Sequence, residues 1–263
     1  MFTLTPGREP GLGSPVPWPL PPPRLRPARD EVHVWRVVLD HRPSCVEALL
    51  LFLAGDERAR ADRFRFERDR GRFVVGRATL RQLLGRYLGR APEALSFRYG
   101  ERGKPDLAWE AEASPPLRFN VSHSHGLALH AVTLDRHLGV DLERIETRFQ
   151  EDIAERFFSR HEVATLRALP VEQQTAAFFT CWTRKEAYVK AKGDGLSFAL
   201  DRFAVSLDEP ATLLHTQDDP REAARWRLAT LRPGSDFAAA LAVAGSDWRL
   251  ECWEWATSCG CAL

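Results

Sequence analysis

The stretch LGVDLERI, residues 138–145, alternates apolar and charged side chains with the two-residue period of a β-strand. Val140 and Leu142 point to one face of this strand, and Asp141 and Glu143 point to the other. The apolar face has to be buried against other elements, so the strand belongs to a packed sheet. Two carboxylates side by side on the remaining face repel each other, which indicates that they face an opposite charge supplied from elsewhere.

The segments around this strand alternate between the two-residue period of strands and the roughly 3.6-residue period of helices. Residues 1–30 hold half of the chain's 18 prolines, and this composition predicts an extended or disordered arm because proline fixes φ and removes a backbone donor. We expect a strand at 32–39, helices at 44–54 and 68–89, loop at 101–105 and around 115–116, a hairpin made of 127–134 and 138–145, and four strand-like segments after residue 201. The domain division that we predict is 1–30, 31–136 and 137–263.

Two helices in the second half have clear end signals. Ser159 stands three residues before Glu162, a capping box that starts a helix at about Arg160. Pro170 opens a longer helix that ends at Gly193, a suitable C-cap. The order of strand, helices, hairpin, helices and strands predicts an α+β fold with two halves that meet after residue 136.

The composition is that of a soluble cytoplasmic protein. Apolar residues make up 44% and charged residues 28%, and the net charge of +1 gives no global field for nucleic acid or membranes. Eleven arginines between Arg58 and Arg90 nevertheless predict a cationic face. No apolar run reaches the ~20 residues of a membrane helix, and the N-terminus lacks a signal-peptide pattern. Five cysteines, an odd number, predict free thiols and no disulfide framework.

A second charged motif lies in CWTRKEAYVKAKGDGL, residues 181–196. On a helix, Trp182, Glu186 and Lys190 recur four residues apart and form one stripe. The other basic residues of the segment are expected to add positive charge around this stripe; they are Arg184, Lys185 and Lys192. Taken alone, a Glu–Lys pair four residues apart is also a common surface feature of helices.

The three acidic residues of the two motifs form a set of hard oxygen donors. Mg²⁺ takes such donors, usually together with substrate phosphates, so Asp141, Glu143 and Glu186 are candidate metal ligands. The alternative for residues 141–143 is a solvated edge strand with a polar outer face.

Two further segments offer contacts for an anion. In FNVSHSHG, residues 119–126, Ser122 and His123 are adjacent and so point to opposite sides of an extended chain, which argues against a Ser–His hydrolase. We expect this hydroxyl and this imidazole to contact an anion from a loop; a structural loop histidine is the alternative. In ERGKPDL, residues 101–107, a glycine between two cations could close over a phosphate, although many surface loops look similar.

Together and in this order, these motifs resemble the 4′-phosphopantetheinyl transferase superfamily, and more narrowly its surfactin-synthetase-activating type. The resemblance runs from about residue 50 to 206. The segments that carry it are RFRFERDRGRFVVGRATLR, RGKPDL, FNVSHS, GVDLE, FFSRHE and CWTRKEAYVKAKGDGLS. It implies two similar α/β halves in a pseudo-twofold arrangement, each a small antiparallel sheet packed with helices.

The resemblance also implies an activity and its partners. Family members transfer the 4′-phosphopantetheine arm of coenzyme A to a serine of an apo acyl or peptidyl carrier protein and release 3′,5′-ADP. By that pattern Asp141, Glu143 and Glu186 hold Mg²⁺, and the serine proton goes to Glu186, directly or through water. Lys190 and His123 complete the catalytic set.

The coenzyme A contacts that the resemblance implies come from several segments. They are Arg60, which matches a position used for the 3′-phosphate, then Arg102, Gly103, Lys104, Ser122, His123, Asp141 and Lys190. Arginine suits such bidentate phosphate contacts. The two halves would complete the site within one chain, which predicts a monomer that acts without nucleic acid or membrane.

Three other functions remain open at this point. The same acids and bases would suit a Mg²⁺-dependent nucleotide diphosphate phosphohydrolase. A nucleic-acid-binding module built on the arginine-rich helix is disfavoured by the acidic residues interleaved there, Asp62, Glu67 and Asp69. An inactive transferase is disfavoured by the intact motifs. The Pro-rich arm departs from the family pattern, and Leu142, between the two acids, cannot bind a metal.

Overall fold

The computed structural model describes residues 18–22, 25, 27–100, 105–108, 116–146, 151–193 and 199–257. The first half contains β1 (Glu31–Val38), α1 (Pro43–Leu49), α2 (Gly55–Ala61), α3 (Glu67–Leu88), β2 (Phe97–Tyr99), β3 (Pro105–Leu107), β4 (Leu117–Ser124) and β5 (Leu127–Leu134). The second contains β6 (Leu138–Arg144), α4 (Glu151–Phe157), α5 (Arg160–Ala168), α6 (Val171–Lys192), β7 (Phe203–Val205), β8 (Leu213–Thr216), β9 (Trp226–Leu231), β10 (Phe237–Ala244) and β11 (Arg249–Glu254).

The two halves repeat one topology. In each half a strand is followed by helices, of which the last has 22 residues, then by a short two-stranded ribbon and a final antiparallel pair. The sheet orders β1-β5-β4 and β6-β10-β9 correspond strand by strand. The predicted α+β fold with two similar halves is therefore confirmed. The last strand, β11, crosses back and pairs in parallel with β1 of the first half.

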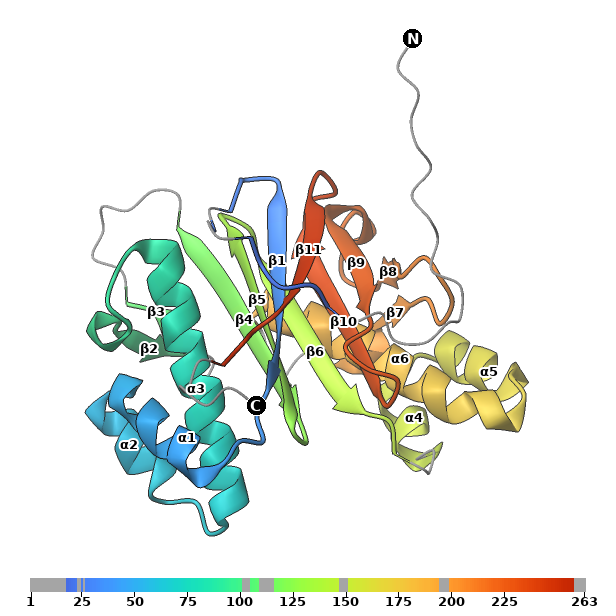
Figure 1. Ribbon diagram of the computed structural model, residues 1–263. Coiled ribbons are helices and arrows are strands. Elements are labelled where there is room, and N and C mark those ends of the chain that lie inside the picture. The colour runs from blue at the N-terminus through green and yellow to red at the C-terminus, as the bar shows by residue number, and fades with distance from the viewer. Residues whose placement is uncertain are drawn as a thin grey trace.

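The chain packs in four layers, with α1–α3 and α4–α6 on opposite sides of the strands (Figure 1). One core lies between α3 and the first sheet, and a second lies between α6 and the other sheet. A third core joins the two sheets and includes Val34, Leu129, Val140 and Leu241. Because β6 is covered on both faces, Asp141 and Glu143 point towards the α6 side and not into open solvent.

Several local predictions are confirmed. Ser159 and Glu162 form the capping box, with Glu162 N donating to Ser159 Oγ at 3.3 Å and Ser159 N donating to Glu162 Oε2 at 2.7 Å. Helix α6 follows Pro170, and its C-cap is Gly193 with φ of 84°. Such a left-handed cap is open to glycine without strain.

The predicted hairpin of 127–134 and 138–145 is wrong. Strand β5 pairs with β4 through the turn at His125–Gly126, and β6 pairs with β10 of the other sheet. The prediction missed β4 because Asn120, Ser122 and Ser124 gave it the polar look of a loop. These side chains are buried and find partners on β6, which no local pattern reveals.

Part of the predicted arm contacts the folded body. Trp18 Nε1 donates to the Arg232 carbonyl at 3.0 Å, and Glu254 N donates to the Pro19 carbonyl at 2.9 Å. The rest of the prediction for residues 1–30 falls largely outside the described residues, and the domain division stays a prediction.

The thiol prediction needs a correction. Cys45 is disulfide-bonded, whereas Cys181 and Cys252 are free. An odd cysteine count excludes pairing of every cysteine and does not exclude a single bridge. Among the described helices, none combines the length and apolarity that a bilayer crossing requires.

Candidate active site

Gly139 brings the two acidic motifs together. A Cβ at this position would lie 2.1 Å from the Ala187 carbonyl oxygen and 2.4 Å from the Ala191 nitrogen, both on the α6 backbone. Only glycine allows α6 to approach β6 this closely. The helix therefore presents Glu186 and Lys190 to the acidic face of β6.

Asp141 is the centre of a buried polar cluster. Lys190 Nζ donates to Asp141 Oδ1 at 2.6 Å, and Ser122 Oγ donates to the same oxygen at 3.0 Å. Lys190 Nζ also lies 3.0 Å from Ser122 Oγ. The other carboxylate oxygen, Asp141 Oδ2, is buried and has no hydrogen-bond partner among the described residues. Asp141, Lys190 and Ser122, predicted from three motifs, are therefore in direct contact.

The other two carboxylates lie in the field of Asp141. Burial and the Asp141 charge raise the pKa of Glu143, whose Oε2 accepts a hydrogen bond from Ser124 Oγ at 3.0 Å. Burial, Asp141 and Glu143 raise the pKa of Glu186. Its Oε1 is buried and lacks a partner among the described residues. Two acids whose ionisation is disfavoured beside the charge of a third have too little positive charge around them.

These residues fit a hard divalent cation. Within the described part of the chain, Asp141 Oδ2 and Glu186 Oε1 are buried acceptors without a hydrogen-bond partner, and oxygen donors of this kind suit Mg²⁺. The described residues nevertheless contain no ready-made group of three or more metal-ligating side chains. Mg²⁺ keeps several waters and uses few protein oxygens, so an incomplete protein shell is compatible with it.

A cavity of about 610 Å³ adjoins this cluster in the first half. It lies among α2, α3, β4 and β5, and its lining includes the predicted contacts Arg60, Ser122 and His123. Ser122 thus touches both the cavity and Asp141. Burial, with smaller contributions from the positive charges of Lys190 and Arg60, lowers the pKa of His123. A neutral imidazole can still donate one hydrogen bond to an anion.

The cavity also contains cations and rings that the motifs did not reveal. The guanidinium of Arg60 lies 5.1 Å from the ring centre of Phe73, so this cation is held over an aromatic wall. Arg72 is paired with Asp40 through two hydrogen bonds of 2.6 and 2.9 Å. Because Asp40 already neutralises the charge of Arg72, this side chain is less available to an anionic ligand than an unpaired cation.

Arg77 is the most informative of the missed residues. Its side chain is 9% exposed and lines the cavity, and its Nη1 has no hydrogen-bond partner among the described residues. It shares the buried carboxylate of Glu57 with Arg81, at 3.5 and 2.6 Å respectively. One carboxylate and two guanidinium groups leave an excess positive charge at the cavity wall. The i, i+4 spacing of the two arginines on α3 was the only available signal.

His130 lies in the wall of the same cavity and is uncharged. Complete burial, with the positive charge of Arg77, lowers the pKa of His130 to about 3. Its Nδ1 has no partner among the described residues. Position 130 falls within an apolar-looking strand, and no local pattern distinguishes it from its neighbours. The predicted contacts Arg102, Gly103 and Lys104 lie outside the described residues; Pro105, which follows them, lines the cavity.

The expectation that Arg184, Lys185 and Lys192 add charge around the acidic site is wrong. Lys185 pairs with Glu162 and Lys192 pairs with Glu222. Arg184 Nη1 donates to the Ser206 carbonyl at 2.6 Å. Residues one or two positions from Glu186 or Lys190 face other sides of a helix, which the stripe at Trp182, Glu186 and Lys190 already implied.

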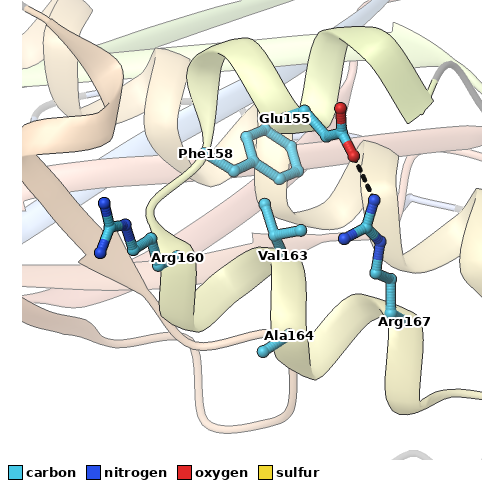
Figure 2. Close-up of a pocket in the computed structure, with 6 residues that line it drawn as sticks. All are labelled: Glu155, Phe158, Arg160, Val163, Ala164 and Arg167. Carbon is cyan, nitrogen blue, oxygen red and sulfur yellow. Dashed lines mark hydrogen bonds and ion pairs between the residues drawn. The ribbon is translucent and has the colours of Figure 1, made fainter.

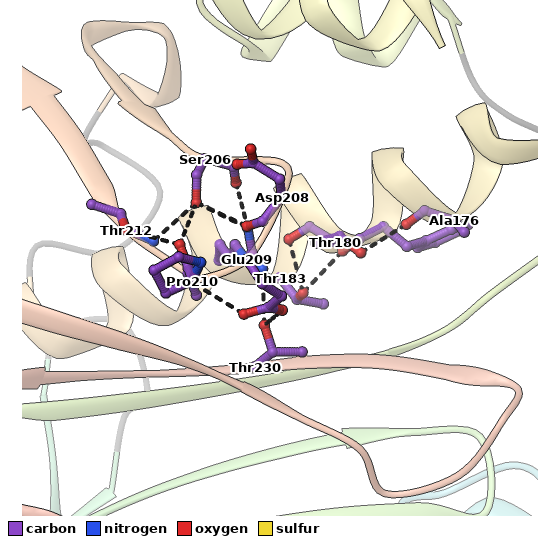
Figure 3. Close-up of polar contacts among 12 residues, drawn as sticks. Ala176, Thr180, Thr183, Ser206, Asp208, Glu209, Pro210, Thr212 and Thr230 are labelled. Atoms are coloured by element: carbon purple, nitrogen blue, oxygen red, sulfur yellow. Dashed lines mark hydrogen bonds and ion pairs between the residues drawn. The ribbon is translucent and has the colours of Figure 1, made fainter. Parts of the chain in front are cut away.

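Arg184 fastens the connection between β7 and β8 to α6. Within that connection Ser206, Asp208, Pro210 and Thr212 are linked to one another, and Glu209 reaches Thr230 of β9 (Figure 3). Arg184 Nη2 donates to Glu209 Oε1 at 2.9 Å. The arginine of this motif therefore stabilises the second half and does not contact the acidic site.

A second, smaller cavity of about 280 Å³ lies between α4 and α5. Figure 2 shows Phe158, Val163 and Ala164 with Arg160 on one side and the Arg167–Glu155 ion pair on the other. None of the predicted site residues that the structure describes lines it.

Comparisons with known proteins agree with this geometry. A family model described as "4′-phosphopantetheinyl transferase superfamily" matches residues 137–242, and one described as "4′-phosphopantetheinyl transferase, N-terminal" matches residues 41–134. The 4′-phosphopantetheinyl transferase HetI of Nostoc sp. is 44% identical over 241 residues, which cover 90% of this chain and 98% of that protein. The chain belongs to the 4′-phosphopantetheinyl transferase superfamily.

Other relatives include the surfactin-type enzymes that the motifs indicated. The 4′-phosphopantetheinyl transferase Sfp of Bacillus subtilis is 31% identical over 163 residues, covering 62% of this chain and 70% of that one. AcpT of Salmonella typhimurium, of the same enzyme type, is 41% identical over 114 residues, covering 43% and 56%. This protein is a 4′-phosphopantetheinyl transferase, an enzyme that moves the phosphopantetheine arm of coenzyme A to carrier proteins.

Proposed function

We propose that Asp141, Glu143 and Glu186 bind Mg²⁺ and that the 610 Å³ cavity receives the 3′,5′-ADP portion of coenzyme A. The observation that carries this assignment is the position of Ser122. Its side chain lines the cavity and donates to Asp141, so a diphosphate at the edge of the cavity would lie beside the acidic cluster. The bound ion would neutralise charge on that diphosphate.

The anionic ligand would be held by groups of the first half. His123 and Arg60 offer hydrogen-bond donors, and Arg77 offers an excess positive charge and an Nη1 that no described residue bonds. Phe64 and Phe73 give the cavity an aromatic wall suited to a purine ring. Arg102, Gly103 and Lys104 stay proposed contacts on the strength of their motif.

The chemical step needs one base and one cation from the chain. The serine oxygen of the carrier forms a bond to the phosphorus next to pantetheine, and the bond from that phosphorus to the bridging oxygen breaks. The serine proton passes to Glu186, directly or through water, because its raised pKa makes this carboxylate the stronger base. Lys190 stabilises the negative charge on the departing 3′,5′-ADP, and His123 orients the diphosphate.

The test is the intact mass of apo acyl and peptidyl carrier proteins after incubation with this protein, coenzyme A and Mg²⁺. We expect a gain of one phosphopantetheine arm, abolished by a chelator and restored by excess Mg²⁺. Transfer that a chelator leaves unchanged would contradict the metal assignment. Coenzyme A cleavage without any gain of mass would favour the phosphohydrolase, which the comparisons do not support.

The same reasoning extends to the setting of the enzyme. Ser122 comes from the first half and Asp141 and Lys190 from the second, so one chain supplies the cluster and a monomer suffices. We propose a cytoplasmic location, where coenzyme A is available, and action without nucleic acid or membrane. The net charge of +1 supports the absence of a nucleic-acid partner.

A further inference from the structure

Three polar side chains of β4 bond to the main chain of β6, although the two strands belong to different sheets. Strand β4 is one edge of the first sheet, and β6 is one edge of the second. The Asn120 side chain accepts from Val140 N at 2.9 Å. Ser122 Oγ accepts from Leu142 N at 3.3 Å. Ser124 Oγ accepts from Arg144 N at 3.1 Å, so the three bonds use alternate main-chain N–H groups of β6.

The two serines also reach the two acidic side chains. Ser122 Oγ donates to Asp141 Oδ1, and Ser124 Oγ donates to Glu143 Oε2, each at 3.0 Å. Each hydroxyl therefore accepts from the backbone one residue beyond the carboxylate to which it donates. The spacing of the serines, S-x-S, matches the spacing of the acids, D-x-E, because both strands share the two-residue period.

The backbone donors determine where each hydroxyl proton points. A hydroxyl has one donor and two acceptor sites. Ser122 Oγ accepts from Leu142 N and from Lys190 Nζ, so its proton is left for Asp141. These contacts use the whole hydrogen-bonding capacity of the Ser122 hydroxyl. Of the adjacent pair Ser122 and His123, His123 therefore remains to bond a ligand phosphate. Ser124 Oγ likewise accepts from the backbone and donates to Glu143, and it also lies 3.3 Å from His125 Nδ1, whose N–H can fill its second acceptor site.

We propose that Ser124 is a positioning residue that holds Glu143 in the orientation in which it binds a divalent cation, as Ser122 holds Asp141. This inference rests on the proposed Mg²⁺ site. Ser124 and Glu143 come from different halves, so the contact also sets the position of this ligand relative to the cavity. Outer partners of metal ligands characteristically change metal affinity by about 10- to 100-fold when removed.

The experiment compares Ser124→Ala with Asn120→Ala in the full chain. Asn120 is the matched control because it forms the same bond to β6 from the same face of β4 but bonds to no carboxylate of the described residues. Mn²⁺ binding without coenzyme A is measured by electron paramagnetic resonance. The Mg²⁺ concentration for half-maximal transfer, the KM for coenzyme A and the Tm are measured alongside.

We expect Ser124→Ala to weaken Mn²⁺ binding and to raise the half-maximal Mg²⁺ concentration by about 10-fold or more. The KM for coenzyme A should stay within about twofold, because Ser124 does not line the cavity. Asn120→Ala should lower the Tm and leave Mn²⁺ binding unchanged. Equal Tm losses in both variants with unchanged Mn²⁺ binding would overturn the proposal, since Ser124 would then be only structural.

Ser124→Thr and Ser124→Val provide a second comparison in case the alanine variant does not fold. They have the same shape and differ in the hydroxyl, so only the threonine variant should retain Mn²⁺ affinity. Equal affinities would contradict the positioning role. In a Glu143→Ala background, Ser124→Ala should have no further effect on Mn²⁺ binding.

The proposal and the function on which it rests fail differently. A wild-type enzyme that modifies carriers but binds no Mn²⁺ overturns the metal site and the role of Ser124, and leaves the transferase assignment intact. A wild-type enzyme that binds Mn²⁺ with the expected dependence on Ser124 but modifies no carrier supports the metal site and the positioning role, and contradicts the transferase assignment.

Discussion

Lys185 and Glu186, which are adjacent on α6, have separate roles, and Lys185→Met tests this. Lys185 and Glu162 are both fully buried, with Nζ and Oε2 2.8 Å apart. Lys185 Nζ also donates to the Phe203 carbonyl at 2.7 Å. Glu162 accepts from the backbone of Ser159 at 2.7 Å and of Val205 at 2.8 Å. The pair therefore joins α5, α6 and β7.

Removal of Lys185 leaves a buried carboxylate without its cation. Breaking a buried ion pair on one side costs about 3–5 kcal/mol of unfolding free energy. We expect the lower end, about 3 kcal/mol, because two backbone N–H groups still bond Glu162. At about 2–4 °C per kcal/mol for a chain of this size, the Tm falls by about 6–12 °C.

Urea unfolding measures this loss, and Lys192→Met on the same helix is the control. Lys192 pairs with Glu222 at 2.7 Å, but its side chain is 29% exposed, so its removal costs at most about 1 kcal/mol. Well below its Tm, the Lys185→Met enzyme should keep its kcat, because Lys185 does not contact the acidic cluster. Equal losses below about 1 kcal/mol in both variants, or a kcat lost while the fold is intact, would refute the reasoning.

Three further changes test the site. The folded-state pKa of Glu186 is raised, so without metal its ionisation destabilises the fold as pH rises from about 4.5 through the raised pKa. Glu186→Gln should therefore abolish transfer, yet at pH values above this range it should raise the Tm of the metal-free protein. A lower Tm than that of the wild type at pH 8 would contradict this. Gly139→Ala should prevent native packing, because its Cβ would meet the α6 backbone at 2.1 Å; a soluble variant with wild-type Tm would show that α6 can move aside. Arg77→Gln should raise the KM for coenzyme A about 10-fold or more, while the matched change at Arg72, already paired with an acid, should raise it less; the reverse order would move the anion contact to Arg72.

Local sequence patterns predicted much of the fold. The capping box at Ser159, the glycine cap at Gly193 and the two-residue period around Asp141 act within a few residues, so the sequence alone predicts them. The ordered motifs likewise placed Asp141, Lys190 and Ser122 in one functional group, and the structure puts them in contact.

The errors arose where partners come from distant parts of the chain. Strand β4 looked like a loop because its polar residues bond to β6, on the other sheet. Lys185 looked like a site cation because its partner, Glu162, lies on another helix. Arg77 was one arginine among eleven until burial and the count of charges around Glu57 distinguished it.

The sequence by itself determined the periodic segments, their ends and the identity of the reactive groups, because these depend on neighbouring residues along the chain. The tertiary structure alone decided how the two sheets meet, which cations are neutralised and which carboxylate oxygens lack partners. Burial and hydrogen-bond satisfaction depend on residues that are far apart in sequence. The match between S-x-S on β4 and D-x-E on β6 is such a case: both patterns are visible in the chain, and only packing of the two halves joins them.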